Sequence, residues 1–123
     1  MTVASLEGLR LLVVEDEAMV AMLVEDMLGE LGCVVVEVAP SVKKAVAIAS
    51  ASEIPIDGAV LDVNVGGEKV FPVADALAAR GIPFVFATGY GHSALEGPYA
   101  GHELIAKPFR LNGLRQALSN WLK

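Results

Sequence analysis

A short uncharged run in the middle of the chain constrains the fold more than any other feature. Residues 58–61, with the sequence GAVL, carry no polar side chain, and the run ends at Asp62. An uninterrupted apolar run of this length predicts a strand buried on both faces, as in a parallel sheet covered by helices on both sides. Asp62 would then lie at the carboxyl end of a central strand, where ligands bind in open α/β sheets. Taken alone, an aspartate at a strand end is more often a turn or cap residue.

Strands and helices alternate along the rest of the sequence. Four further apolar runs predict strands at residues 9–14, 34–38, 82–87 and 102–106. Apolar side chains at helical spacing predict helices at residues 18–31, 42–49, 70–78 and 111–122. Ser41 is the expected N-cap of the second helix. Residues 89–101 contain four glycines and one proline, so any helix there should be short.

The alternating order of these elements predicts an α/β fold. Two adjacent parallel strands need a right-handed crossover, which is usually a helix. We therefore expect a flavodoxin-like, doubly wound, five-stranded parallel sheet with helices on both faces. We adopt the strand order 2-1-3-4-5, which is common for such sheets, although the order itself leaves no trace in the sequence. With 123 residues, the chain should form one domain over residues 1–123.

Charge and composition argue against several classes of protein. The formal net charge of −6, with nine scattered Lys and Arg residues, disfavours direct binding of nucleic acid. No apolar run approaches the roughly 20 residues that a membrane-spanning helix needs, and residues 1–10 lack the pattern of a secretion signal. Cys33 is the only cysteine, so no internal disulfide can form, which fits a reducing compartment. We expect a cytoplasmic protein.

Polar residues stand at the predicted carboxyl ends of four strands. Glu15 and Asp16 follow the first strand, Asp62 ends the third, Thr88 follows the fourth, and Lys107 follows the fifth. Three carboxylates in one crevice would repel each other unless a cation lay among them. A hard divalent ion that prefers oxygen ligands, above all Mg²⁺, suits such a site.

The same residues fit the chemistry of phosphoryl transfer. The hydroxyl of Thr88 and the ammonium of Lys107 are suited to phosphoryl oxygens, and Asp62 is suited to act as the nucleophile. Each residue also has an ordinary structural explanation, because acids before a helix offset its dipole, threonine is common in strands, and lysine is usually a surface charge. Their shared position at one edge of the sheet favours the functional interpretation.

Four sequence segments together resemble a bacterial response regulator receiver domain over the whole length of the chain. The segments are LLVVEDE at 11–17, AVLDVN at 59–64, FATGY at 86–90 and AKPF at 106–109. The resemblance implies that Asp62 accepts a phosphoryl group from a sensor histidine kinase or a histidine phosphotransfer protein. The FATGY segment is similar to the FAT GUY subgroup, which implies a stand-alone protein that works with kinases of the HWE or a related type.

The resemblance also implies a set of metal ligands. Asp16 and Asp62 would bind Mg²⁺ directly, Glu15 would assist through water, and the backbone carbonyl of Asn64 would complete the protein ligands.

The resemblance further implies how the phosphoryl group would be held. Thr88 and Lys107 would contact its oxygens. The peptide bond between Lys107 and Pro108 is expected to be cis, an arrangement almost confined to bonds that precede proline.

The chain departs from the receiver pattern in two places. Receivers usually carry Phe or Tyr three residues before the lysine, where this chain has Leu104, so the usual aromatic switch is absent. Tyr90 is a candidate replacement, although it could equally pack over the neighbouring loop. Receivers also carry a proline soon after the nucleophile, where this chain has residues 65–67, VGG, so the following loop and third helix could be repositioned.

The leading interpretation is a single-domain response regulator of a two-component or phosphorelay system. It would signal by conformational change to a downstream protein that the sequence does not identify, and its catalysis would be limited to self-catalysed phosphotransfer and dephosphorylation. One alternative is a Mg²⁺-dependent phosphohydrolase of the haloacid dehalogenase kind, but such enzymes need a second aspartate where this chain has Asn64. Another alternative is a receiver-like binding module that does not accept phosphate.

Overall fold

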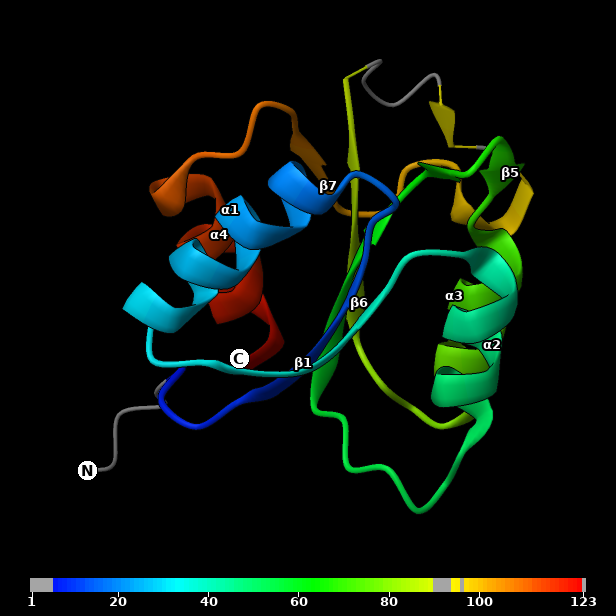
Figure 1. Cartoon of the computed structure of the whole chain (residues 1–123), viewed down its shortest axis with the longest axis horizontal. Coiled ribbons are helices and arrows are strands. Elements are labelled where there is room, and N and C mark those ends of the chain that lie inside the picture. Colours follow the sequence, from blue (N-terminus) through cyan, green and yellow to red (C-terminus); the bar gives the residue numbers. More distant parts are fainter. Residues whose placement is uncertain (1–5, 90–93, 96, 123) are drawn as a thin grey trace.

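A five-stranded parallel sheet forms the centre of the computed structural model, which describes residues 6–89, 94–95 and 97–122 (Figure 1). From one edge to the other, the strands are β2 (Val34–Ala39), β1 (Arg10–Val14), β3 (Gly58–Asp62), β6 (Phe84–Thr88) and β7 (Leu104–Ala106). When only these five strands are counted in chain order, the arrangement is 2-1-3-4-5, as predicted.

Helices cover both faces of the sheet. Figure 1 shows α1 (Ala18–Glu30) and α4 (Leu111–Ser119) on one face, and α2 (Val42–Ser50) and α3 (Phe71–Ala79) on the other. Short 3₁₀ turns, η2 (Gly97–Tyr99) and η3 (Asn120–Leu122), lie before β7 and after α4. The predicted flavodoxin-like α/β class is therefore confirmed. None of the helices in the described part of the chain is long and apolar enough to cross a membrane.

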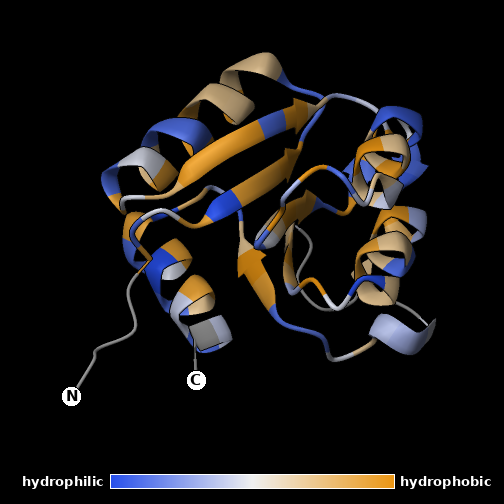
Figure 2. Cartoon of the chain, turned by 90° about the horizontal axis from the view of Figure 1, so that it is seen from below, coloured by the Kyte–Doolittle hydropathy of each residue, from blue (hydrophilic) through white to orange (hydrophobic). Residues whose placement is uncertain are grey.

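The apolar core lies in two layers, one on each side of the sheet. Every residue of β3 is buried, because its side chains alternate between the two layers. Leu61 packs with α2 and α3, whereas Val60 packs with α1 and α4. Figure 2 shows the apolar strands between the two pairs of amphipathic helices. The uncharged run that ends at Asp62 is thus the centre of the molecule, as its composition indicated.

The predicted start of the second helix is correct, because the Ser41 hydroxyl accepts a hydrogen bond from the Lys44 amide at 3.2 Å. The predicted bounds of two strands were too wide. β6 begins at Phe84 and β7 begins at Leu104, each two residues later than expected. Residues 82–83 and 102–103 precede the paired residues of these strands. Among these described residues, only the carbonyls of Pro83 and Glu103 accept a hydrogen bond from the neighbouring strand, at 3.1 and 3.2 Å.

A small hairpin beyond β3 was missed. β4 (Asn64–Val65) pairs with β5 (Glu68–Lys69) in antiparallel fashion, where the sequence predicted only a loop. Gly66 and Gly67 have φ values of +58° and +82°, and a two-residue hairpin turn with positive φ at both positions strongly favours glycine. Strands of two residues are too short to show an alternating pattern, so only the glycine pair signalled this element.

We predict that Gly58→Ala displaces Trp121. A Cβ atom at residue 58 would lie 2.3 Å from Cζ3 of the indole, so the ring of Trp121 or β3 must move. The free energy of unfolding should fall by about 1–3 kcal/mol, as is usual for overpacking. Because Trp121 is the only tryptophan, its fluorescence should shift to longer wavelength.

Gly113→Ala is the matched control. A Cβ atom there comes no closer than 4.0 Å to Ile105, and alanine in a helix interior is favoured over glycine by roughly 0.5–1 kcal/mol. Unchanged fluorescence and unchanged stability in the Gly58 variant would contradict the packing described here.

Candidate functional site

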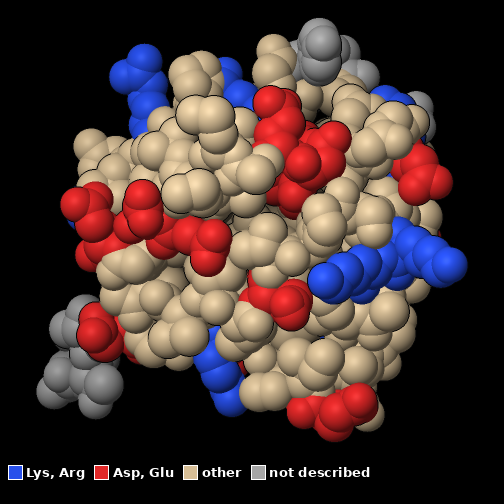
Figure 3. All heavy atoms as spheres, viewed as in Figure 1, with Lys and Arg blue, Asp and Glu red and all other residues tan. Residues whose placement is uncertain are grey.

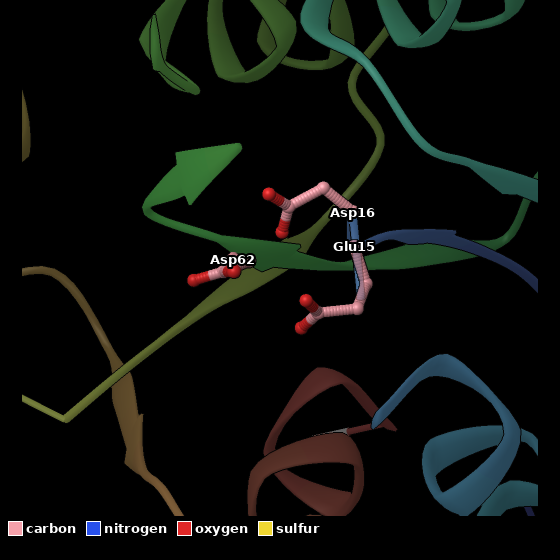
Figure 4. A group of neighbouring side chains, drawn as sticks. All are labelled: Glu15, Asp16 and Asp62. Carbon is pink, nitrogen blue, oxygen red and sulfur yellow. The ribbon is translucent and has the colours of Figure 1, made fainter. Parts of the chain in front are cut away.

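The structure brings the predicted polar residues together at one edge of the sheet. Glu15 and Asp16 follow β1, Asp62 ends β3, Thr88 ends β6, and Lys107 follows β7. Oxygen atoms from the three carboxylates lie within 4.8 Å of one another. Figure 4 shows these carboxylates, carried by the ends of two neighbouring strands, directed into the same space.

The ammonium of Lys107 holds two of the carboxylates. Its Nζ atom lies 3.0 Å from Glu15 Oε1 and 3.2 Å from Asp62 Oδ2. Glu15 is 3% exposed and Asp62 is 9% exposed, so the two acids share their counter-charge in a largely dry environment. The backbone fixes this lysine, because its amide donates to the Thr88 carbonyl at 3.1 Å.

Burial and the neighbouring charges shift the pKa values of these groups in opposite directions. Burial raises the pKa of both Glu15 and Asp62 above the ordinary carboxyl range, and the hydrogen bonds and charge of Lys107 only partly oppose it. Burial alone would lower the pKa of Lys107, but its contacts with the two acids outweigh burial and raise that pKa. The lysine is therefore a fixed positive charge, whereas the two acids are ionised at an energetic cost.

Asp16 differs from its two acidic neighbours because it is exposed to solvent. Its Oδ2 atom accepts a hydrogen bond of 2.9 Å from the Gly66 amide at the tip of the β4–β5 hairpin. That hydrogen bond is the main reason that the pKa of Asp16 is lowered. The hairpin thus orients an ionised carboxylate at the mouth of the site.

The pairing of the hairpin leaves the Asn64 carbonyl on the side of the site. The Val70 amide donates to the Val63 carbonyl at 2.9 Å, so the next pair, Asn64 and Lys69, exchanges no hydrogen bonds across an antiparallel ladder. The Asn64 amide instead donates to the Asp62 carboxylate. Because the amide and carbonyl of one residue point the same way in an extended strand, the carbonyl of Asn64 is also directed away from the hairpin partner.

This set of donors fits Mg²⁺. Carboxylates of Asp16 and Asp62 and the carbonyl of Asn64 are hard oxygen ligands, and the solvent-facing side next to Asp16 leaves room for the waters that Mg²⁺ retains. Glu15 is already bonded through both oxygens, to Lys107 and to the Glu17 amide at 3.1 Å, which suits an indirect role.

The structure describes two of the three other predicted positions. The peptide bond between Lys107 and Pro108 is cis. Leu104 is partly buried against the apolar layer beside α2 and α3. Tyr90 lies outside the described residues, so its suggested part in a switch stays a prediction.

Sequence reasoning missed Tyr99, which joins η2 to the core. Its ring lies 5.7 Å from that of Phe71 and 5.5 Å from that of Phe86, and its hydroxyl donates to Asp75 Oδ1 at 2.6 Å. Burial, followed by the contact with Asp75, raises the pKa of Tyr99 to about 12. No periodic pattern singles out this residue, because it follows a glycine and a proline in an irregular segment.

Removing the charge of Asp62 should stabilise the metal-free protein at neutral pH. A carboxyl whose pKa is raised on folding gives its full stability below its ordinary pKa of about 4 and loses it as the pH rises through the folded value. In EDTA at pH 7, Asp62→Asn should therefore raise the free energy of unfolding, by the order of 1 kcal/mol that is usual for single substitutions. The difference should vanish in acid.

Urea denaturation measures this effect. Asp26→Asn, on the exposed side of α1, is the control and should change stability by less than about 0.5 kcal/mol. An Asp62→Asn variant less stable than the parent at pH 7 would show that burial of Asp62 is not the dominant effect.

The Tyr99 hydroxyl should titrate in strong alkali. Because its pKa is raised on folding, the part of the free energy of unfolding that depends on Tyr99 is fully present below pH 10. It falls as the unfolded chain loses its phenolic proton, and it levels off near pH 12. Absorbance of the phenolate, compared with that of Tyr99→Phe, measures this pKa directly. In the variant, the free energy of unfolding should lose this part of its pH dependence, and a phenolic pKa near 10 in the parent would contradict the buried contact with Asp75.

Comparison with known proteins agrees with this fold. The family model described as "Response regulator receiver domain" matches residues 11–119. The solution structure of SdrG from Sphingomonas melonis Fr1 is 42% identical, with 98% of this chain and 100% of that chain covered and a TM-score of 0.78. SdrG from Pseudomonas melonis Fr1 in its BeF3-activated conformation is 43% identical, with 93% of this chain and 96% of that chain covered and a TM-score of 0.76.

A third solved structure is more distant in sequence. The receiver domain of the sensor histidine kinase PA1611 from Pseudomonas aeruginosa PAO1, with magnesium coordinated in its active site cleft, is 26% identical, with 94% and 98% covered and a TM-score of 0.76.

A curated relative is longer than this chain. The phyllosphere-induced regulator PhyR of Methylorubrum extorquens is 34% identical over 116 residues, which are 91% of this chain and 43% of PhyR, so the chain spans less than half the length of that relative. With the family match covering most of the sequence and the acidic site at the end of the sheet, the chain belongs to the response regulator receiver domain family.

Proposed function

We propose that this receiver domain accepts a phosphoryl group on Asp62 and passes a signal to a protein partner by conformational change. The donor would be a phosphohistidine of a sensor kinase, of the HWE or a related type, or of a histidine phosphotransfer protein. The observation that carries the proposal is the contact of the Lys107 ammonium with Asp62 Oδ2, at 3.2 Å, beside two further carboxylates. We also propose a cytoplasmic location, with which a chain whose single cysteine, Cys33, is buried is compatible.

The residues of the site would have different roles in an in-line transfer of the phosphoryl group. A carboxylate oxygen of Asp62 would attack the phosphorus atom as the bond between phosphorus and the donor imidazole nitrogen breaks, and the imidazole leaves with the electron pair of that bond. Lys107 already touches Asp62 and would hold a phosphoryl oxygen of the new acyl phosphate. Thr88, at the end of the adjacent strand, would hold another through its hydroxyl.

A bound Mg²⁺ would neutralise charge that otherwise repels the incoming phosphoryl group. Asp16, Asp62 and the Asn64 carbonyl would hold the ion, and Glu15 would act through water. The magnesium in the PA1611 receiver and the BeF3-activated form of SdrG support this proposal by analogy.

The geometry disfavours a haloacid dehalogenase-like hydrolase. Such an enzyme needs a second carboxyl group two residues after the nucleophile to move protons. That place holds Asn64, which is part of β4 and carries no acid. A receiver-like binding module without phosphorylation remains the second alternative, and the following experiment separates all three.

Incubation with phosphoramidate and Mg²⁺ should add one phosphoryl group to the chain, as measured by intact mass. Asp62→Asn should abolish the addition, because the attacking oxygen is lost. Asp16→Asn should slow it by about 10²-fold or more, because a metal-holding charge is removed. Asp26→Asn, which removes an acid from the exposed side of α1, is the matched control and should react like the parent.

Each alternative gives a different result in the same assay. Steady release of many equivalents of phosphate would indicate a hydrolase. No added mass in the parent protein, with the fold intact, would indicate a binding module.

A further inference from the structure

The outer edge of the sheet at β7 has main-chain groups that face away from its neighbour. The Phe86 amide donates to the Glu103 carbonyl at 3.2 Å, and the Lys107 amide donates to the Thr88 carbonyl at 3.1 Å. In a parallel ladder only alternate residues of a strand bond to a given neighbour. The amides and carbonyls of Leu104 and Ala106 therefore point outward, and within residues 6–89, 94–95 and 97–122 none of these groups has a hydrogen-bond partner.

A groove of about 480 Å³ runs between this edge and α4. Small residues, Ala106, Gly113 and Ala117, line it, so little side-chain volume occupies the space beside the strand. At the amino end of β7, the Asn120 side-chain amide donates to Glu103 Oε2 at 2.7 Å and joins the two walls. Residues 103–107 all line the groove, so it runs along the whole of β7.

Two arginines lie at the groove. Arg110 lines it, and Arg115 lines an adjoining hollow that shares Asn112 and Gln116 with it. The acid in the lining, Glu103, lies at the other end, where it accepts the hydrogen bond from Asn120.

Residues 104–123 contain four bases and no acid, although the net charge of the whole chain is −6. Lys107 is already paired with Glu15 and Asp62, so Arg110 and Arg115 are the bases that the structure leaves for a partner in this segment, within the residues described. Arg110 is exposed, and its side chain forms no hydrogen bond or ion pair with another described residue. Arg115 is exposed and bonds to the neutral side chain of Asn112 at 3.1 Å, which leaves its charge uncompensated. Figure 3 shows basic side chains over the loop between β7 and α4, and acidic ones over α1.

We propose that the β7 edge binds an extended, acidic peptide segment of a protein partner as a sixth strand. The main chain of the segment would pair with Leu104 and Ala106, and its carboxylates would face Arg110 and Arg115. Addition of a strand to an open sheet edge is a known mode of peptide recognition, in which the main chain supplies affinity and the side chains supply specificity. Nucleic acid would also be attracted by the arginines, but it lacks the amide groups that the edge requires.

This interaction goes beyond the proposed phosphoryl transfer and does not require it. It concerns the outer edge of β7, whereas the acidic site is built from the ends of the strands. The test therefore uses the unphosphorylated chain without Mg²⁺, so that its outcome is independent of the chemistry at Asp62.

Amide hydrogen exchange by NMR tests the pairing directly. The probe is a synthetic seven-residue peptide of alternating glutamate and valine with blocked ends. At saturation, exchange of the Leu104 and Ala106 amides should slow by about tenfold or more, while Ile105 and Lys107, already paired with β6, should change little. A peptide with alternate backbone nitrogens methylated, and one with lysine in place of glutamate, should give no protection.

Charge reversal on the groove tests the second element of the proposal. The double variant Arg110→Glu and Arg115→Glu should weaken binding of the acidic peptide by about tenfold or more. The double variant Lys43→Glu and Lys44→Glu, on the exposed side of α2, makes the same change in net charge and should bind like the parent.

Several results would overturn the proposal. One is equal weakening of peptide binding by both double variants, and another is protection centred on the exposed Met19 and Met22 of α1. A third is the same protection from a single-stranded oligonucleotide. A fourth is protection that grows with protein concentration in the absence of peptide, which would indicate that a second copy of the chain binds the edge.

Discussion

The contact of one ammonium with two nearly buried carboxylates determines how much negative charge the end of this sheet can hold. Glu15 and Asp62 come from neighbouring strands, and burial raises the pKa of each. Lys107 approaches both because it directly follows β7, and its amide is tied to the carbonyl of Thr88. The pairing of β6 with β7 therefore fixes the backbone of Lys107 near the two carboxylates. Only the flexible side chain of Lys107 has to extend from there to reach them.

Most of the site could be predicted from the sequence because the fold places strand ends at a common edge. Asp62, Thr88 and Lys107 each follow an apolar run, so once the strands are parallel their side chains must converge. The bounds of β6 and β7 were less predictable, since residues such as Ile82 are apolar enough for a strand but lie before the sheet pairing starts.

Other features depend on contacts between distant segments, and the sequence gives no local signal for them. The hydrogen bond from Gly66 to Asp16 joins positions 50 residues apart and exists only because β3 lies beside β1. The contact of Tyr99 with Asp75 joins an irregular segment to α3. The paired glycines marked a turn, but the two short strands around it had too few residues for a pattern.

The uneven distribution of charge along the chain also affects how the molecule meets other molecules. All acidic residues precede residue 104, and the last segment, most of which forms α4, is purely basic. On the face drawn in Figure 3, acidic side chains lie over α1 and basic ones over the β7–α4 loop. The long-range field of such a charge distribution turns two proteins toward a preferred mutual orientation before they touch, and dissolved salt weakens the effect. The order of charges along this sequence therefore affects which side of the domain faces another protein when the two meet.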